Sequence, residues 1–477
     1  MVRIGRNESM GLNSSARRAR RARPTTVAGR AAVVGTPRRG VRPLRNAYTV
    51  RVDYDVVVVG GGPAGSSAAT MLALGGHKVG LFERDRFPRF HIGESLLAST
   101  NESLDAIGAA AAIRALRFPE KWGAIFGTAD GRFESDIGFS ASEEVPQPQT
   151  WQVERAKFDQ ALLEHAARSG VAVHQPSRVL DAHIDHASVS LDVACGRGTR
   201  SIVRARAMID ASGRWGLLAR KLDLRVPEPR LANIAIFSHF SGVPRAPGPR
   251  PTDIRIVARD DLGWIWVIPI DADLTSVGVV LRRDLFDRLP RVRHEDYLAQ
   301  AIAETPALRH LMADAKREWP VRVEKDFSYR ARRYAGDRWL LVGDAGAFVD
   351  PVFSTGVAIA LESGVEAGRL LHDALQEDDL SARRFAKFNR VQRARCVAFR
   401  RFVTGFYTRP FRDVFYHAEP PPSLRNAVVT LLAGYWKPTL RTRLRLERFY
   451  LIAWLQRWFR FLPPVPGVGT AQGAEEG

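Results

Sequence analysis

Three glycines and one acid have the spacing of a turn that binds a dinucleotide. Gly60, Gly62 and Gly65 satisfy the pattern G-x-G-x-x-G, and Glu83 follows about 20 residues later, as such sites require. The first glycine permits a tight turn, the second lets the backbone approach a pyrophosphate, and the third lets a helix pack against a strand. A carboxylate at Glu83 can accept hydrogen bonds from both hydroxyls of a ribose. The residues expected to contact the dinucleotide here are Gly60, Gly62, Pro63, Ala64, Gly65, Glu83, Arg84 and Arg155.

A second group of polar residues follows the apolar segment RWLLVGD. Gly343 and Asp344 end this predicted strand, and a helix of small residues is predicted to begin about ten residues later. The acid at the strand end can bind a ribityl hydroxyl. The amides of Ser354, Thr355 and Gly356 at the helix start can hold the electron-rich edge of a flavin or a small anion. Together with the glycine turn, this group indicates that the dinucleotide is FAD.

The elements that must position these residues are visible in the apolar pattern. The run YDVVVV from Tyr54 is typical of a strand buried on both faces, and a helix and the strand KVGLFE follow the glycine turn. Residues 231–282 predict alternating strands, and the chain after Gly364 is Arg-rich and helical. We expect an α/β fold, namely a Rossmann-like FAD-binding domain of the glutathione-reductase type with an inserted β-rich substrate lobe and a C-terminal helical region. The predicted parts are a basic disordered extension at 1–50, the FAD-binding domain at 51–375 with its lobe at about 225–320, and the helical region at 376–477.

The last predicted helix carries apolar and basic residues in the same turns. In TLRTRLRLERFYLIAWLQRWFRFLPPVPG, Leu, Phe and Trp recur at helical spacing among six arginines. The favoured interpretation is that the Leu and Trp face packs onto the enzyme body while the arginines meet water. Association with an anionic membrane surface is the less favoured alternative.

Composition narrows the class of protein. The net charge is +20, much of it from the Arg-rich first 50 residues, which also lack periodic apolar residues. Such a leader could be a transit peptide or an arm that binds nucleic acid. A solvated extension or a wrongly assigned start codon is the favoured explanation, and no nucleic-acid partner is expected. No stretch of about 18 apolar residues predicts a membrane span, and the expected location is the cytoplasm. Cys195 and Cys396 lack metal-ligand spacing, so no metal site is expected.

The pairing of G-x-G-x-x-G with the late GDAGAFVDP resembles the class A flavin monooxygenase superfamily. Within it, PRFHIGESLL at 88–97, GWIWVIP at 263–269 and DPVFSTG at 350–356 resemble the flavin-dependent halogenases that act on phenols and pyrroles. The resemblance implies that FAD, reduced by a separate flavin reductase, reacts with O2, and that a halide is thereby oxidised to hypohalous acid. No second dinucleotide pattern suggests an NADPH domain of the chain's own.

The resemblance also assigns roles to residues. Lys121 matches the lysine that captures or steers the oxidised halogen, and Trp264 and Trp266 match the wall between flavin and substrate. The halide is expected at Ser354, Thr355 and Gly356, mainly against the last two amides. The plainer alternatives are a solvated surface lysine and tryptophans that only fill a core.

Two departures from the family pattern bear on the substrate. Ala98 replaces a proline that many members have after the GES motif, and Phe353 stands where tryptophan halogenases have a glutamate. An indole bound as in those enzymes is therefore disfavoured, and a phenol or pyrrole is expected, free or tethered to an acidic carrier protein. The alternatives left open are an aromatic hydroxylase or a reductase resembling geranylgeranyl reductases, and, from another class, a basic RNA-binding or membrane-associated protein.

Overall fold

The glycine turn belongs to a mainly parallel sheet around strand β1 (Thr49–Val59). In the computed structural model the strand order is β19-β20-β10-β1-β2-β7, and β1, β2, β7, β10 and β20 run parallel. Residues 56–58 are fully buried, because helices and loops cover both faces of a parallel sheet. Strands β8 and β9 extend from β10 as an antiparallel arm. The sheet strands are β2 (Val79–Phe82), β7 (Ala172–His174), β8 (Ser177–Ile184), β9 (Val189–Cys195), β10 (Thr199–Asp210), β19 (Ala335–Gly336) and β20 (Trp339–Leu341).

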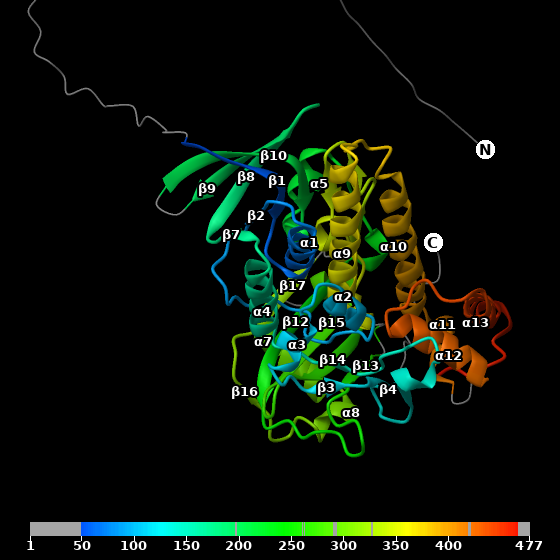
Figure 1. Ribbon diagram of the computed structural model, residues 1–477. Helices are drawn as coiled ribbons and strands as arrows, with labels where there is room; N and C mark the ends of the chain where they lie inside the picture. The colour runs from blue at the N-terminus through cyan, green and yellow to red at the C-terminus, as the bar shows by residue number, and fades with distance from the viewer. Residues whose placement is uncertain are drawn as a thin grey trace, which may run out of the picture. The chain divides into compact units, whose positions relative to one another are not determined.

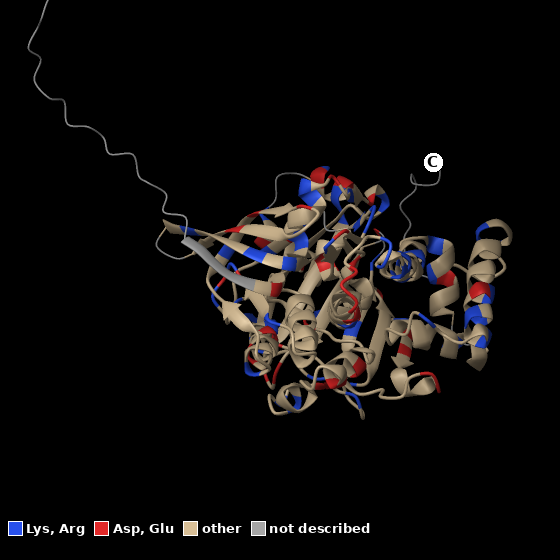
Figure 2. Ribbon diagram, turned by 45° about the horizontal axis from the view of Figure 1, so that its top comes forward, with Lys and Arg blue, Asp and Glu red and all other residues tan. Residues whose placement is uncertain are grey.

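The structure describes residues 49–465 apart from 196–197, 260, 262, 290–292, 326–327 and 418–420. Residues 1–48 of the predicted basic extension lie outside this part of the chain. Over the described chain, Lys and Arg intermingle with Asp and Glu on many elements (Figure 2). No helix of the described residues is both long enough and apolar enough to cross a membrane.

Helix α1 (Pro63–Leu74) starts at the glycine turn and packs against α9 (Thr355–Gln376) and α4 (Arg155–Arg168), as Figure 1 shows. Small residues allow the close approach of α1 and α9. A Cβ atom on Gly364 of α9 would lie 2.4 Å from the backbone oxygen of Ala64 in α1, which no side chain could accommodate. The two predicted cofactor segments, one at each helix start, are thereby packed side by side.

The second large sheet forms the substrate lobe. Its order is β16-β12-β15-β14-β13-β4-β5, with β17 paired to β12. Alternate residues of β14 face opposite sides, so that Trp264 and Trp266 join the core shared with the FAD-binding domain, while Ile265 and Val267 join the core beneath α7 (His294–Ala303). The strands are β4 (Gly123–Thr128), β5 (Glu134–Gly138), β12 (Asn233–Ser241), β13 (Ile254–Ala258), β14 (Trp264–Pro269), β15 (Thr275–Arg282), β16 (Lys316–Arg317) and β17 (Arg322–Lys325).

The predicted fold class is confirmed, since an FAD-binding α/β domain, a β-rich lobe and C-terminal helices are all present. The lobe reaches beyond the predicted range of 225–320, because β4 pairs in parallel with β13 and brings β5 with it. Two small sheets complete the fold. They pair β3 (Glu120–Lys121) with β6 (Thr150–Trp151), and β11 (Arg225–Pro227) with β18 (Tyr329–Ala331) and β21 (Ala347–Phe348). The shorter helices are α2 (Thr100–Ala106), α3 (Ala110–Arg114), α5 (Leu217–Lys221), α6 (Arg283–Asp287) and α8 (Pro306–Arg309).

The C-terminal region is helical, as the sequence predicts, but its last helix packs on a different face. The helices are α10 (Ala386–Phe406), α11 (Arg409–Tyr416), α12 (Pro422–Leu432) and α13 (Leu440–Phe459), and α13 packs on α11 and α12. Leu446, Phe449 and Ala453 are buried, whereas Trp454 and Trp458 are 56% and 65% exposed. The prediction that the tryptophan face packs inward is therefore wrong. The helix carries two apolar stripes, and periodicity alone does not tell which one the enzyme body covers.

Candidate functional site

A cavity of about 500 Å³ opens where the carboxyl ends of the parallel strands meet the second sheet, the usual place for a ligand in an α/β fold. Most of the predicted site residues line it. These are Gly60, Gly62, Pro63, Ala64, Glu83, Arg84, Arg155, Trp264, Trp266, Asp344, Ser354 and Gly356. The other predicted residues, Gly65, Lys121, Gly343 and Thr355, lie outside the lining. The structure thus brings together segments that are up to about 300 residues apart in sequence.

The glycine turn has the geometry that its pattern requires. Gly60 has a φ of +106°, and a Cβ there would lie 2.3 Å from the backbone oxygen of Ala211. A Cβ on Gly65 would lie 1.9 Å from the oxygen of Gly60, so both glycines are needed for the turn and the helix to meet. Gly62 is different, because a Cβ there would find only Arg89 Nη2, at 3.5 Å. Its backbone is open to the cavity, which fits the close approach of a pyrophosphate.

Glu83 lies at the end of β2, is buried, and lines the cavity. Its Oε2 accepts a hydrogen bond from the Gly61 amide at 2.6 Å, and its Oε1 accepts one from the Asp85 amide at 2.8 Å. Carboxylate oxygens have further lone pairs, so the same group can hold the glycine turn in place and still accept ribose hydroxyls. Arg84 is half exposed and forms an ion pair with Asp85 at 3.3 Å.

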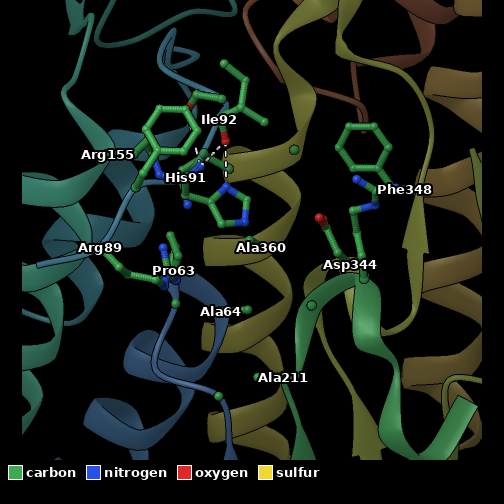
Figure 3. A pocket seen from close by; sticks show the side chains of 18 of the residues that line it. Pro63, Ala64, Arg89, His91, Ile92, Arg155, Ala211, Asp344, Phe348 and Ala360 are labelled. Carbon is green, nitrogen blue, oxygen red and sulfur yellow. Dashed lines mark hydrogen bonds between the residues drawn. The ribbon is translucent and has the colours of Figure 1, made fainter. Parts of the chain in front are cut away.

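Asp344 extends into the cavity from the turn after β20, across from Arg89, His91 and Arg155 (Figure 3). Burial raises the pKa of Asp344 to about 6, although nearby arginines, Arg155 first among them, oppose the shift. A ribityl hydroxyl would give this carboxyl group a hydrogen-bond partner. Gly343, with a φ of +54°, lies behind it, and a Cβ there would come within 3.0 Å of the Ala64 side chain. Gly343 therefore lets the two cofactor segments touch rather than facing the cofactor.

Arg155 organises the PRFHIGES segment. It forms a bidentate ion pair with buried Asp159, at 2.8 and 2.9 Å, and its Nη1 donates to the backbone oxygens of Ile92 and Gly93 at 2.8 and 3.3 Å. Figure 3 shows Arg155 and His91 both meeting the Ile92 oxygen. Burial and the nearby Arg155 lower the pKa of His91 to about 4, so this histidine is neutral at pH 7.

The tryptophan pair forms one wall of the cavity. The two ring centroids are 5.8 Å apart, and both side chains are buried. Trp264 Nε1 donates to the Tyr407 hydroxyl at 2.8 Å, and Trp266 Nε1 donates to Ser276 Oγ at 3.0 Å. The Tyr407 hydroxyl in turn donates to Asp350, whose pKa burial raises to about 7. The wall is therefore fixed by hydrogen bonds to the DPVFSTG loop as well as by packing.

Lys121 lies in the two-stranded sheet beside this cavity and is only 1% exposed. Its Nζ donates to Ser95 Oγ at 2.8 Å and to the Leu96 backbone oxygen at 2.7 Å. Burial lowers the pKa of Lys121 to about 7, with Asp253 opposing the shift. The amine itself does not line the cavity, but Ser95 does. Burial of this amine argues against the solvated surface lysine considered as the plainer alternative.

The predicted halide loop is the start of α9. Ser354 has a φ of +57° and its amide already donates to the Pro351 oxygen at 3.0 Å, so the amides of Thr355 and Gly356 are the better candidates. Gly356 lines the cavity, whereas Thr355 is buried behind it. Phe353 packs within an aromatic cluster, with ring centroids 5.1 Å from Phe402 and 5.3 Å from Phe406.

One polar pair at the cavity was not predicted from the sequence, although one of its two residues lies in the PRFHIGES motif. Glu94, in PRFHIGES, lines the cavity, and its Oε1 lies 2.7 Å from His239 Nε2. His239 lies on β12 at alternate positions from Ala235 and Phe237, both of which line the cavity. This alternation is the signal that could have indicated a histidine facing the site.

Comparison with known proteins places the site in context. Residues 53–385 match the family model described as an FAD binding domain. The chain is 33% identical over 406 residues to the 1H-pyrrole-2-carbonyl-[peptidyl-carrier protein] chlorinase of Pseudomonas fluorescens, covering 80% of this chain and 89% of that protein.

Two solved structures share the fold over nearly their whole length. The flavin-dependent brominase Bmp2 is 30% identical with a TM-score of 0.75, covering 84% of this chain and 100% of its own. A flavoprotein/dehydrogenase from Cytophaga hutchinsonii is 31% identical with a TM-score of 0.79, covering 85% of this chain and 99% of its own.

Proposed function

Because this chain belongs to the flavin-dependent halogenases, we propose that it halogenates an electron-rich ring of the phenol or pyrrole class, free or tethered to a carrier protein. It is an FAD-dependent enzyme that acts on aromatic substrates, as its family is. The class of ring, the carrier and the roles of the individual residues are part of this proposal. So are O2 and a halide as co-substrates, and a separate flavin reductase that reduces FAD. The cytoplasmic location expected from the sequence stays a prediction.

The observation that carries the residue assignment is the buried amine of Lys121 next to the cavity. When bound and reduced, FAD would supply two electrons to O2 and the halide would supply two more, so that the halide is oxidised to hypohalous acid and the second oxygen atom leaves as water. A neutral amine has two N–H donors and one lone pair. The two donors of Lys121 are used by Ser95 Oγ and the Leu96 oxygen, which leaves the lone pair as the nucleophile. With its pKa lowered to about 7, a large share of Lys121 is neutral at pH 7.

Other residues of the chain bind and orient. Gly60 to Gly65 and Glu83 hold the adenosine end of FAD, and Asp344 holds the ribityl chain. The amides of Thr355 and Gly356 hold the halide at the positive end of the 22-residue helix α9. Trp264 and Trp266 form a buried apolar wall that excludes water from the reacting groups.

The carrier-tethered form of the substrate has its support in the pyrrole chlorinase of Pseudomonas fluorescens, whose name states a carrier-bound substrate. A chain with a net charge of +20 suits an acidic partner, because opposite charge speeds and orients encounter.

The test supplies purified protein with FAD, a flavin reductase, NADPH, O2 and bromide. A phenol and a pyrrole are offered free, and the pyrrole is also offered as a thioester on a carrier protein, with products identified by mass spectrometry. Brominated product that is absent with Lys121→Met and present with Lys157→Met supports the proposal, since Lys157 is an exposed lysine on α4. Hydroxylated product, or bromination that survives Lys121→Met, would contradict it.

A further inference from the structure

Glu94 and His239 form a buried ionisable pair with spare hydrogen-bonding capacity. Glu94 is 3% and His239 2% exposed, and Oε1 and Nε2 lie 2.7 Å apart. Glu94 Oε2 and His239 Nδ1 have no hydrogen-bond partner among the described residues. A buried polar atom without a partner costs folding free energy, and such atoms are rare in native proteins. An unpartnered carboxylate oxygen on a cavity-lining residue is best explained by a ligand that supplies the donor.

The surroundings of the pair are aromatic. Phe90, Phe237 and Trp266 line the same cavity, and their rings follow one another at centroid distances of 6.3 and 5.6 Å. Trp319 lies 4.4 Å from His239, and fixes the imidazole from the side. This part of the cavity therefore offers flat apolar surface with one carboxylate among the rings, which suits an aromatic ring that carries a hydrogen-bond donor.

His239 fixes the position of the carboxylate. If Nε2 carries the proton, it donates to Oε1 of Glu94 and leaves Oε2 to accept a second hydrogen bond. Because His239 lies on β12 of the second sheet and Glu94 on the segment before α2, the bond also fixes the carboxylate relative to the tryptophan wall.

The pair is adjacent to the proposed reactive amine. Glu94 and Ser95 are consecutive in an extended segment, with Cα atoms about 3.8 Å apart, and Ser95 Oγ accepts the hydrogen bond from Lys121 Nζ. The Glu94 backbone oxygen accepts from the Val153 amide at 2.6 Å, and Ser95 forms a β-bridge with Gln152. Glu94 and the hydrogen-bond partner of Lys121 are therefore held on adjacent residues of one extended segment.

We propose that Glu94, positioned by His239, is the substrate anchor: its carboxylate accepts a hydrogen bond from an N–H or O–H group on the aromatic ring. This inference rests on the proposed function and deepens it, because it restricts the substrate to rings with such a donor. A phenol or an N–H pyrrole meets this requirement, whereas its O-methyl or N-methyl analogue does not.

The test measures binding to the FAD-loaded protein, so that it does not depend on turnover. The probes are 4-methylphenol with 4-methylanisole, and pyrrole with N-methylpyrrole. The wild-type protein should bind the donor-bearing member of a pair roughly ten- to hundredfold more tightly, the range of one hydrogen bond to a charged acceptor. In Glu94→Gln this preference should fall to a few-fold, while binding of the methylated analogue stays the same. Glu164→Gln, on the exposed face of α4, is the matched control.

A second variant separates anchoring from folding. His239→Phe keeps a ring against Trp319 but removes the donor to Oε1, and it should reduce the preference without loss of bound FAD, as measured by flavin absorbance. The proposal is overturned if the wild-type protein shows no preference for the donor. It is also overturned if Glu94→Gln keeps that preference, or if it weakens FAD binding and both analogues equally. Bromination of the same probes tests the proposed function separately, since donor preference in binding without bromination would contradict only that function.

Discussion

Replacement of Lys121 by methionine should change stability in a direction that reverses with pH. The side chains are similar in length, and the variant removes only the amine from a site that is 1% exposed. Because burial lowers the pKa of Lys121 from 10.5 to about 7, a protonated amine is unfavourable in the folded protein. At about 1.4 kcal/mol per tenfold change in acidity, the cost is on the order of 5 kcal/mol.

Whether the variant is more or less stable than the wild type depends on whether the folded or the unfolded state binds the proton. Above pH 10.5 the amine is neutral in both states and carries no such cost. As the pH falls toward 7, the unfolded chain takes up a proton that the folded chain does not, so the cost grows, and below 7 it is fully present. Methionine removes this cost but leaves Ser95 Oγ and the Leu96 oxygen without their donor, at about 3 kcal/mol together. The variant should therefore be about 2 kcal/mol more stable than the wild type at pH 6 and about 2 kcal/mol less stable at pH 10, where about 1 kcal/mol of the cost of the buried amine remains.

The assay is thermal unfolding of both FAD-loaded proteins at pH 6, 8 and 10, together with bromination. The difference between the two midpoints should change sign over this range, while bound FAD stays equal and bromination is lost only in the variant. Lys157→Met, at an exposed position, should show no such reversal. A constant difference at all three pH values would refute the argument, because it would mean that the Lys121 amine is not desolvated.

The other predictions concern the cofactor, the wall and the rate. Gly62→Val should fold and lose FAD, measured by flavin absorbance, whereas Gly65→Val should not fold stably, because its Cβ would lie 1.9 Å from the Gly60 oxygen. Tyr407→Phe should lower stability by about 1–3 kcal/mol in urea unfolding, since it leaves Trp264 Nε1 without an acceptor and removes one of the donors to Asp350, which keeps those of Asn233 and Val352; unchanged stability would contradict the hydrogen-bonded wall. Bromination of a free phenol should rise with pH through about 7 as Lys121 becomes neutral, and a rate that falls across this range would count against the amine as nucleophile.

Residues whose roles depend on neighbouring backbone could be predicted from the sequence. Gly60 must adopt a φ of +106°, and the strand, turn, helix and strand around it are continuous in sequence. The same holds for Asp344, which lies three residues beyond its strand. In both places local geometry decides the chemistry, so a pattern of residue types is sufficient.

Pairs formed across the fold could not be found in this way. Glu94 and His239 are 145 residues apart, and Tyr407 and Asp350 are 57 apart on different elements. Nothing in the local sequence of either partner specifies the other, since their meeting depends on the packing of the second sheet and of α10 on the FAD-binding domain. The exposure of the two tryptophans of α13 could not be predicted for the same reason, because tertiary contacts decide which of its two apolar stripes is buried.

The segment from Ile92 to Leu96 explains why distant elements can act on one reaction. Arg155 holds its first two carbonyl groups, and Val153 and the β-bridge to Gln152 keep the next two residues extended. In an extended chain consecutive side chains point to opposite sides, so Glu94 meets His239 on the second sheet while Ser95 meets Lys121 on the small one. One rigid strand of backbone thus fixes the distance between the proposed substrate anchor and the proposed reactive amine. Two catalytic side chains on separate loops would need many more contacts to reach the same precision.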